Sequence, residues 1–157
     1  MKGIFTVLVE NKDGVLSSIA GLFARRGFNI DSLAVGETDN HDISSMTIVS
    51  TGDQRTIDQI EKQLNKKVDV IKVRRLNEAK SISLEMMLVK VSCTAATRSA
   101  IIELCQITGA KIMQVSPKFL LLEYRAEPEG IEDFIDLIKS YGILDIQRTG
   151  TISMSKA

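Results

Sequence analysis

The chain has 157 residues, of which 44% are hydrophobic and 25% are charged, with 20 basic and 20 acidic side chains. This length allows one ordinary domain or two small ones, and the apolar content is sufficient for a core. The balanced charge argues against electrostatic binding to nucleic acid or to an anionic membrane. No apolar run approaches the ~20 residues that a membrane-spanning helix needs.

The first half of the chain alternates between strand and helix patterns. An amphipathic pattern that begins at Val15 is suited to end at Gly27, and the polar stretch 36–42 predicts a hairpin. In chain order, we expect a strand at 4–9, a helix at 15–26, strands at 28–35 and 43–51, a helix that opens at 52–53, and a strand at 68–73.

The same order of elements repeats after a polar, patternless stretch at 77–81, which we interpret as a linker. The expected elements are a strand at 82–93, a helix at 95–108, strands at 111–115 and 119–125, a helix from Pro128 closed by Gly142, and a strand at 143–149. The pattern at 151–157 predicts no element. The sequence therefore predicts an α+β protein of two ferredoxin-like βαββαβ domains in tandem, at 1–76 and 82–157.

The second strand of such a domain lies at the edge of the sheet. An apolar edge strand invites pairing with another chain, because its backbone groups on one side have no partner. The strand that begins at Asn29 is therefore the predicted contact of a homodimer.

The stretch from Glu10 to Leu16 joins the first strand directly to the first helix. Gly14 has no Cβ, so another group can approach the backbone there. The first N–H groups of the helix have no intrahelical partners, and together with the helix dipole they suit a carboxylate or phosphate. Asn11 adds an amide that both donates and accepts. This stretch suggests a receptor for a zwitterion, or more simply a turn in which Asp13 caps the helix.

The remaining chemistry-bearing residues predict neither a catalytic site nor a metal site. His41, the only histidine, lies in the predicted hairpin turn, which favours a solvated side chain. Cys93 and Cys105 fall short of the about four ligands of a structural zinc site, and we interpret them as buried, reduced thiols. Met1 leads straight into the strand pattern without a signal peptide, so we expect a cytoplasmic protein.

Two other classes of function compete for this arrangement of elements. The RNA recognition motif has the same strand order, but it stacks bases on strand aromatics, and aromatic residues make up only 4% of this chain. A stand-alone enzyme lacks a catalytic constellation. A basic patch is predicted, as a solvated surface or as a contact for an acidic partner, from Lys66, Lys67, Lys72, Arg74 and Arg75.

An ordered series of short stretches along both predicted domains carries a resemblance to a known family. They are Leu8–Asn11 with Gly14–Ser17, Gly21–Phe23, Arg26–Leu33, Met46–Val49, Gln59–Lys66, Val68–Val70, Leu88–Val91 and Arg148–Gly150. The first domain resembles an ACT domain, a module that senses amino acids. Nearly the whole chain is similar to the small, regulatory subunits of acetolactate synthase.

The resemblance implies a non-catalytic subunit without a cofactor of its own. Its partner would be the large catalytic subunit, which would carry thiamine diphosphate, magnesium and FAD. The small subunit would raise the activity of that partner and make it sensitive to L-valine, in the biosynthesis of branched-chain amino acids. It would form a homodimer through the edge strands of its ACT domains, with no nucleic acid or membrane partner.

The resemblance also implies which residues hold the effector. They are Asn11, Asp13, Gly14, Val15 and Leu16 of one chain, facing Asn29 and Ile30 of its neighbour. Two departures from the family are Ser18, where a basic residue is common, and an end at 155–157 without the usual basic-glycine tail. Valine, leucine and isoleucine all remain open, because one methylene changes pocket binding by only ~1–3 kcal/mol.

Overall fold

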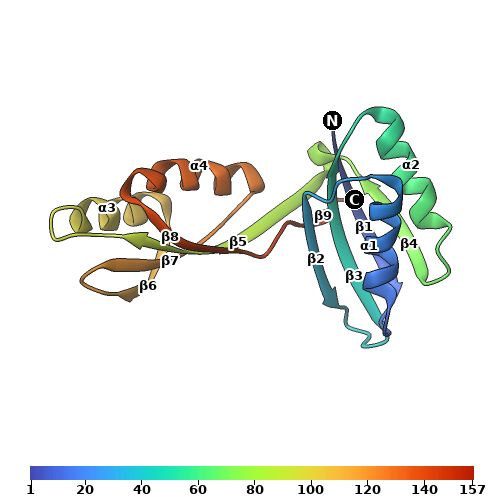
Figure 1. The fold of residues 1–157 in the computed structure, drawn as a ribbon, viewed down its shortest axis with the longest axis horizontal. Coiled ribbons are helices and arrows are strands. Elements are labelled where there is room, and N and C mark those ends of the chain that lie inside the picture. Colours follow the sequence, from blue (N-terminus) through green and yellow to red (C-terminus); the bar gives the residue numbers. More distant parts are fainter. The chain divides into compact units, whose positions relative to one another are not determined.

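The computed structural model describes residues 1–157, and the chain forms two compact units (Figure 1). The first unit comprises Met1–Ser83 together with Thr151–Ala157, and the second comprises Leu84–Gly150. The first division lies close to the linker expected at 77–81, where residues Glu78–Lys80 form a 3-10 helix, η1. The last seven residues, which we had expected in the second domain, belong to the first unit instead.

The first unit has the predicted βαββαβ order. Its elements are β1 (Lys2–Glu10), α1 (Val15–Arg26), β2 (Ser32–Glu37), β3 (Ile43–Thr51), α2 (Gln54–Asn65) and β4 (Val70–Leu76). The sheet order is β2-β3-β1-β4 with antiparallel pairing, so β2 is an edge strand as predicted. Both helices pack on one face of the sheet (Figure 1), where alternate strand residues such as Phe5, Val7 and Ile48 are fully buried.

The helix ends follow local chemistry. Gly27 ends α1 with a left-handed φ of 67°, as predicted, and its N–H donates to the carbonyl of Ala24 at 3.3 Å. Asp53 caps α2, because its side chain accepts from the Thr56 N–H at 2.7 Å. This hydrogen bond, made to the charged form, lowers the pKa of Asp53 below its ordinary value.

The prediction of a strand at 28–35 was wrong in its first part, because β2 begins only at Ser32. The apolar Phe28 and Ile30 alternate with the polar Asn29 and Asp31 as in a strand, but the Asn29 amide donates to the Asp31 carboxylate, and the Ser50 hydroxyl donates to the Asn29 carbonyl. Such side-chain bonds compete with regular pairing. The fourth strand is likewise shifted, since a turn from Lys67 to Val70 delays its start and leaves Val68 95% exposed.

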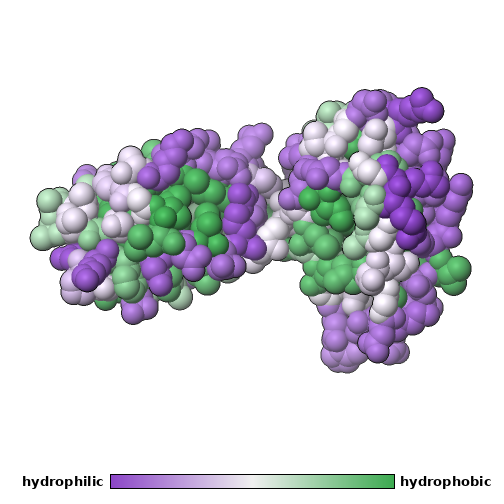
Figure 2. Space-filling model, viewed as in Figure 1, coloured by the Kyte–Doolittle hydropathy of each residue, from purple (hydrophilic) through white to green (hydrophobic).

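The second unit repeats the fold with its own core. Its elements are β5 (Ser81–Ser92, which begins in the first unit), α3 (Arg98–Thr108), β6 (Lys111–Val115), β7 (Phe119–Ala126), α4 (Pro128–Ile138), the 3-10 helix η2 (Lys139–Tyr141) and β8 (Ile143–Arg148). The strand order β6-β7-β5-β8 matches that of the first unit, which confirms the tandem repeat. Apolar side chains still reach the surface of each unit (Figure 2).

The tail forms an unpredicted strand, β9 (Ile152–Ser155), which pairs with β5. It contacts the face of the first sheet that the helices leave open. The Thr151 N–H donates to Ser32 Oγ at 2.8 Å, and the Ser153 N–H donates to Thr47 Oγ1 at 3.4 Å. A pocket of about 230 Å³ lies between this face and the tail. The tail therefore completes the first unit.

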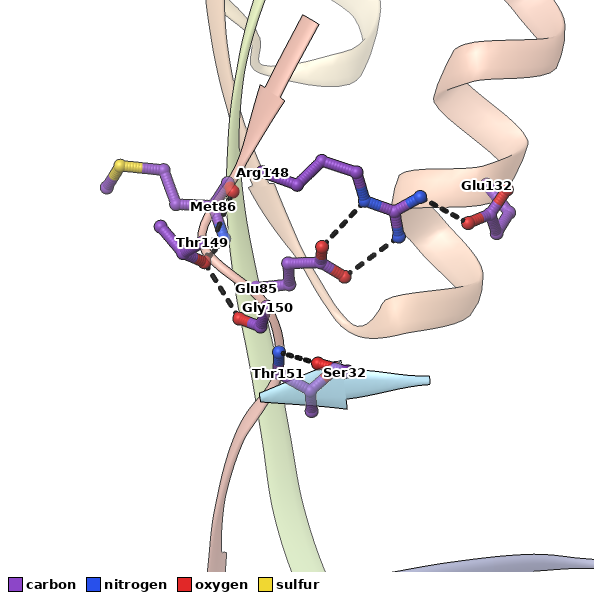
Figure 3. Close-up of polar contacts among 8 residues, drawn as sticks. All are labelled: Ser32, Glu85, Met86, Glu132, Arg148, Thr149, Gly150 and Thr151. Carbon is purple, nitrogen blue, oxygen red and sulfur yellow. Dashed lines mark hydrogen bonds and ion pairs between the residues drawn. The ribbon is translucent and has the colours of Figure 1, made fainter. Parts of the chain in front are cut away.

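A buried carboxylate anchors the end of β8 in the second unit (Figure 3). Glu85 is only 4% exposed, and it accepts two hydrogen bonds from Arg148, from Nε at 2.7 Å and from Nη2 at 3.0 Å. Arg148 Nη1 also donates to Glu132 of α4 at 2.7 Å. The hydrogen bonds to Glu85 and then to Glu132 raise the pKa of Arg148 above its ordinary value, against the opposing effect of burial.

We predict that Arg148→Met lowers the free energy of unfolding of the second unit by about 2–4 kcal/mol, because it leaves the buried Glu85 charge uncompensated. The matched control Glu132→Gln removes only the exposed half of the network and costs at most about 1 kcal/mol. Urea titration followed by tyrosine fluorescence measures this unit alone, since both tyrosines, Tyr124 and Tyr141, lie in it. Equal midpoints for the two variants would contradict the prediction.

Candidate functional site

The loop between β1 and α1 is shaped by Gly14. This residue has a left-handed φ of 84°, and a Cβ built on it would meet no other atom within 4 Å. The helix starts at Val15 without any side-chain cap, so the alternative in which Asp13 caps the helix is wrong. Glycine suits this position both for its φ and because the space beside it is open.

The helix start offers unpaired hydrogen-bond donors. The Val15 N–H makes only a long bond, 3.5 Å, to the Lys12 carbonyl, and the Ser18 N–H donates to the Gly14 carbonyl at 2.9 Å. Between them, the N–H groups of Leu16 and Ser17 have no acceptor within the protein. Two adjacent free donors at a helix N-terminus, next to open space, suit one carboxylate.

Asn11 has a structural role that the sequence did not reveal. Its side-chain Nδ2 donates to the His41 carbonyl at 2.7 Å and to Glu37 Oε1 at 3.2 Å, and its backbone N–H donates to the Asp42 carbonyl at 2.8 Å. Asn11 therefore holds the hairpin between β2 and β3 against the loop. Its Oδ1 accepts no hydrogen bond from the protein, so an acceptor stays available.

Lys12 is a further loop residue that sequence reasoning missed. Its ammonium group lies 2.8 Å from a carboxylate oxygen of Glu10 and 2.9 Å from one of Asp69. The hydrogen bond to Glu10, and then that to Asp69, raise the pKa of Lys12 above its ordinary value. Its charge is thus neutralised locally. No signal in the sequence places Asp69, 57 residues away, beside it.

The two halves of the predicted effector site lie at opposite ends of one sheet. Glu10 pairs with Ile43 at the start of β3, whereas Ser32 pairs with Val49 near its end. Six residues of strand span roughly 20 Å. Asn29, which is exposed, therefore lies far from Asn11 in the same chain. Ile30 is half-buried against the first core.

The predicted basic patch is divided between two faces of β4. Arg75 pairs with Asp58 of α2 at 2.7 Å, whereas Lys72 and Arg74 line the pocket on the opposite face. The side chains of a strand alternate in this way. Met46, on the strand where an RNA recognition motif would show aromatics, is 1% exposed. The structure thus offers no single basic or aromatic platform.

The remaining candidate residues do not cluster with one another. His41 is a solvated turn residue, as predicted, and its Nδ1 lies 2.7 Å from Glu37 Oε2. Cys93 and Cys105 are free and buried, and burial raises the pKa of the Cys105 thiol. No group of three histidine, cysteine or acidic side chains is placed to hold a metal ion. None of the helices has the length and apolar character required to cross a bilayer.

In the first unit, the first strand of a ferredoxin-like sheet leads into a helix at a glycine with open space beside it. The second unit repeats the same fold. This combination defines a regulatory protein of the ACT-domain class. Residues 5–72 match the family described as "AHAS small subunit-like ACT domain", and residues 84–157 match "Small subunit of acetolactate synthase". The chain belongs to the family of acetolactate synthase small subunits.

Individual relatives agree with this assignment over the full chain. The chain is 45% identical to the "Probable acetolactate synthase small subunit" of Archaeoglobus fulgidus, over 98% of this chain and 96% of the relative. It is 44% identical to the acetolactate synthase small subunit of Mycolicibacterium smegmatis, over 96% and 89%. The crystal structure of the small subunit from Thermotoga maritima superposes with a TM-score of 0.92 at 36% identity, covering 100% of this chain and 98% of that one.

We predict that Asn11→Ala loosens the hairpin between β2 and β3. Losing the bonds to Glu37 and His41 costs about 1 kcal/mol, so local amide exchange at Thr38 and Ile43 rises about fivefold. Hydrogen exchange followed by mass spectrometry measures this. The control Asn65→Ala removes a similar amide–carbonyl bond, to Glu61, and leaves the hairpin unchanged. Unaltered hairpin exchange in Asn11→Ala would contradict the role given to this side chain.

Proposed function

We propose that this chain senses L-valine and controls the large catalytic subunit of acetolactate synthase, raising its activity and imposing feedback inhibition. The observation that carries the proposal is the loop at Gly14, where open space meets two free N–H groups, those of Leu16 and Ser17. Thiamine diphosphate, magnesium and FAD belong on the catalytic subunit in this proposal. The buried free thiols support a cytoplasmic location.

The loop supplies complementary groups for both charges of an amino acid. The carboxylate of valine accepts from the Leu16 and Ser17 N–H groups, at the positive end of the dipole of α1. Its ammonium group donates to Asn11 Oδ1, and the exposed Asp13 carboxylate adds a favourable charge. Leu16, which is about half exposed, offers apolar contact to the valine side chain, whereas Val15 is buried and contributes its backbone.

A second copy of the chain completes the site in this proposal. Asn11 bonds to Glu37, the last residue of β2, whereas Asn29 and Ile30 come just before Ser32, its first residue. Antiparallel pairing of β2 with β2 of a second copy sets the start of one strand beside the end of the other. The partner's Asn29 and Ile30 then face the loop at Gly14, which no single chain achieves across roughly 20 Å.

Ligand binding at such a shared site regulates because it favours one arrangement of the subunits over another. We assign the contact with the catalytic subunit to the second unit. Support for this comes from exposed apolar residues on its outer strands and on β5, which a partner would cover. They are Met86, Leu88, Met113, Val115 and Leu144.

We predict that Gly14→Asp raises the valine concentration for half-inhibition at least a hundredfold, while activation of the catalytic subunit stays within twofold. The new carboxylate fills the open space and repels that of valine, and a loss of ~3 kcal/mol is more than a hundredfold in affinity. The assay is acetolactate formation by the reconstituted enzyme, titrated with valine. The left-handed φ strains any side chain at this position, but Asp adopts this conformation more readily than most residues do, so the activation measurement also checks that the fold is kept.

The matched control is Gly14→Asn, which has nearly the same shape without the charge and also tolerates this φ. It separates steric exclusion from charge repulsion, and it shifts the half-inhibitory concentration less than Gly14→Asp does. A wild-type inhibition curve in Gly14→Asp would remove this glycine from the site. Loss of activation as well would indicate misfolding rather than loss of the effector.

We predict that Val35→Lys weakens the homodimer at least tenfold. Val35 is a 47% exposed residue of the edge strand β2, and a lysine there opposes pairing of one edge with another. Sedimentation velocity over a range of concentrations measures the dissociation constant. Val68→Lys is the control, because Val68 is apolar and exposed but lies outside β2. An equally tight dimer in Val35→Lys would exclude β2 as the interface.

A further inference from the structure

The stretch Arg148–Gly150, singled out in the sequence, lies where the chain leaves the second unit for the last time (Figure 3). We propose that the hydrogen bond between Ser32 and Thr151, joined through Gly150 to the Arg148–Glu85 pair, is the route by which effector binding at Asn29 and Ile30 reaches the second unit. This inference rests on the proposed function, because it names how that same site regulates.

The route starts at the effector segment, which leads directly into Ser32. Asn29 and Ile30 are two or three residues away, and Asp31 lies between them and the strand. Asp31 is held on both sides of its chain, because its N–H donates to the Val49 carbonyl at 2.8 Å and its carboxylate accepts from the Thr51 hydroxyl. The Asn29 amide also donates to the Asp31 carboxylate, so a ligand that takes up this amide changes the contacts of Asp31, whose backbone leads directly into Ser32.

Ser32 passes this displacement to the tail. Its hydroxyl oxygen accepts from the Thr151 N–H at 2.8 Å, and Thr151 is only 5% exposed, so neither water nor a neighbouring side chain replaces the bond freely. In the proposed route this bond is the element that changes between made and broken, as coupling between two sites requires. The next tail contact, from the Ser153 N–H to Thr47, is longer at 3.4 Å.

The tail is tied to the second unit two residues before Thr151. The Thr149 N–H donates to the Met86 carbonyl at 3.0 Å, and Thr149 Oγ1 accepts from the Met86 N–H at 3.1 Å. Arg148, next to it, holds the buried Glu85 and reaches Glu132 on α4. Only Gly150, with a left-handed φ of 81°, separates this anchor from Thr151. A displacement of Thr151 therefore acts on β8 and α4, because one residue and not a long flexible linker joins them.

The test compares two serine variants of the full chain. Ser32→Ala removes the acceptor for Thr151, whereas Ser83→Ala removes a tail bond of the same kind, the 2.6 Å contact between the Ser83 and Ser153 hydroxyls, which lies off the route. Hydrogen exchange at residues 143–149 is measured with and without valine, together with valine affinity by calorimetry. In parallel, inhibition and activation are measured with the catalytic subunit.

In the wild-type chain and in Ser83→Ala, saturating valine slows exchange at 143–149. In Ser32→Ala we expect valine affinity and activation within twofold of the wild type, no valine effect on exchange at 143–149, and at most half of the wild-type maximal inhibition. A full exchange response in Ser32→Ala overturns the route. If Ser32→Ala loses valine affinity and Ser83→Ala does not, the route is also overturned, because Ser32 is then part of the binding site. No valine binding to the wild-type chain would refute the proposed function itself.

Discussion

Both units of this protein depend on one geometric constraint, which is that two helices cover only one face of a four-stranded sheet. The apolar residues of that face pair with the helices and form the core, whereas the opposite face must find another cover or stay exposed. In the first unit the C-terminal strand β9 lies against the open face, over residues such as Thr47. In the second unit no such strand covers this face, and Met86 and Leu88 of β5 stay partly exposed.

The same topology separates the two halves of the proposed effector site. Because of the strand order and register, the loop at Gly14 and the segment at Asn29 lie at opposite ends of the sheet. The proposed site is therefore complete only when two copies pair along β2. The segment that a ligand would touch is continuous with Ser32, which bonds to the tail, and the tail is continuous with Arg148 of the second unit. Few bonds need to change for such a signal to pass.

The sequence predicts those elements whose pattern and boundaries are both local. Strand 43–51 is found to the residue, because its alternation is bounded by turn residues on one side and by Gly52 on the other. The apolar spacing of Phe28 and Ile30 predicts a strand there, but the hydrogen bonds of Asn29 and Asp31 hold the segment in an irregular conformation. The loop at Gly14 could be predicted in outline. The ties of Lys12 to Asp69 and of Asn11 to His41, like the strand at 152–155, depend on partners remote in sequence, which no local pattern specifies.

The return of the tail to the first unit also orders events during synthesis of the chain. Domains commonly fold as they emerge, at roughly 5–20 residues per second. Here the sheet of the first unit is complete at β4, but its open face stays uncovered until Thr151–Ala157 have been synthesised, after the whole of the second unit. The first unit therefore spends several seconds as an unfinished nascent domain, and its final structure is reached only after the second unit has been made. A chain that stops before Thr151 lacks the cover of the open face, so a truncation after the second unit alters the first unit as well.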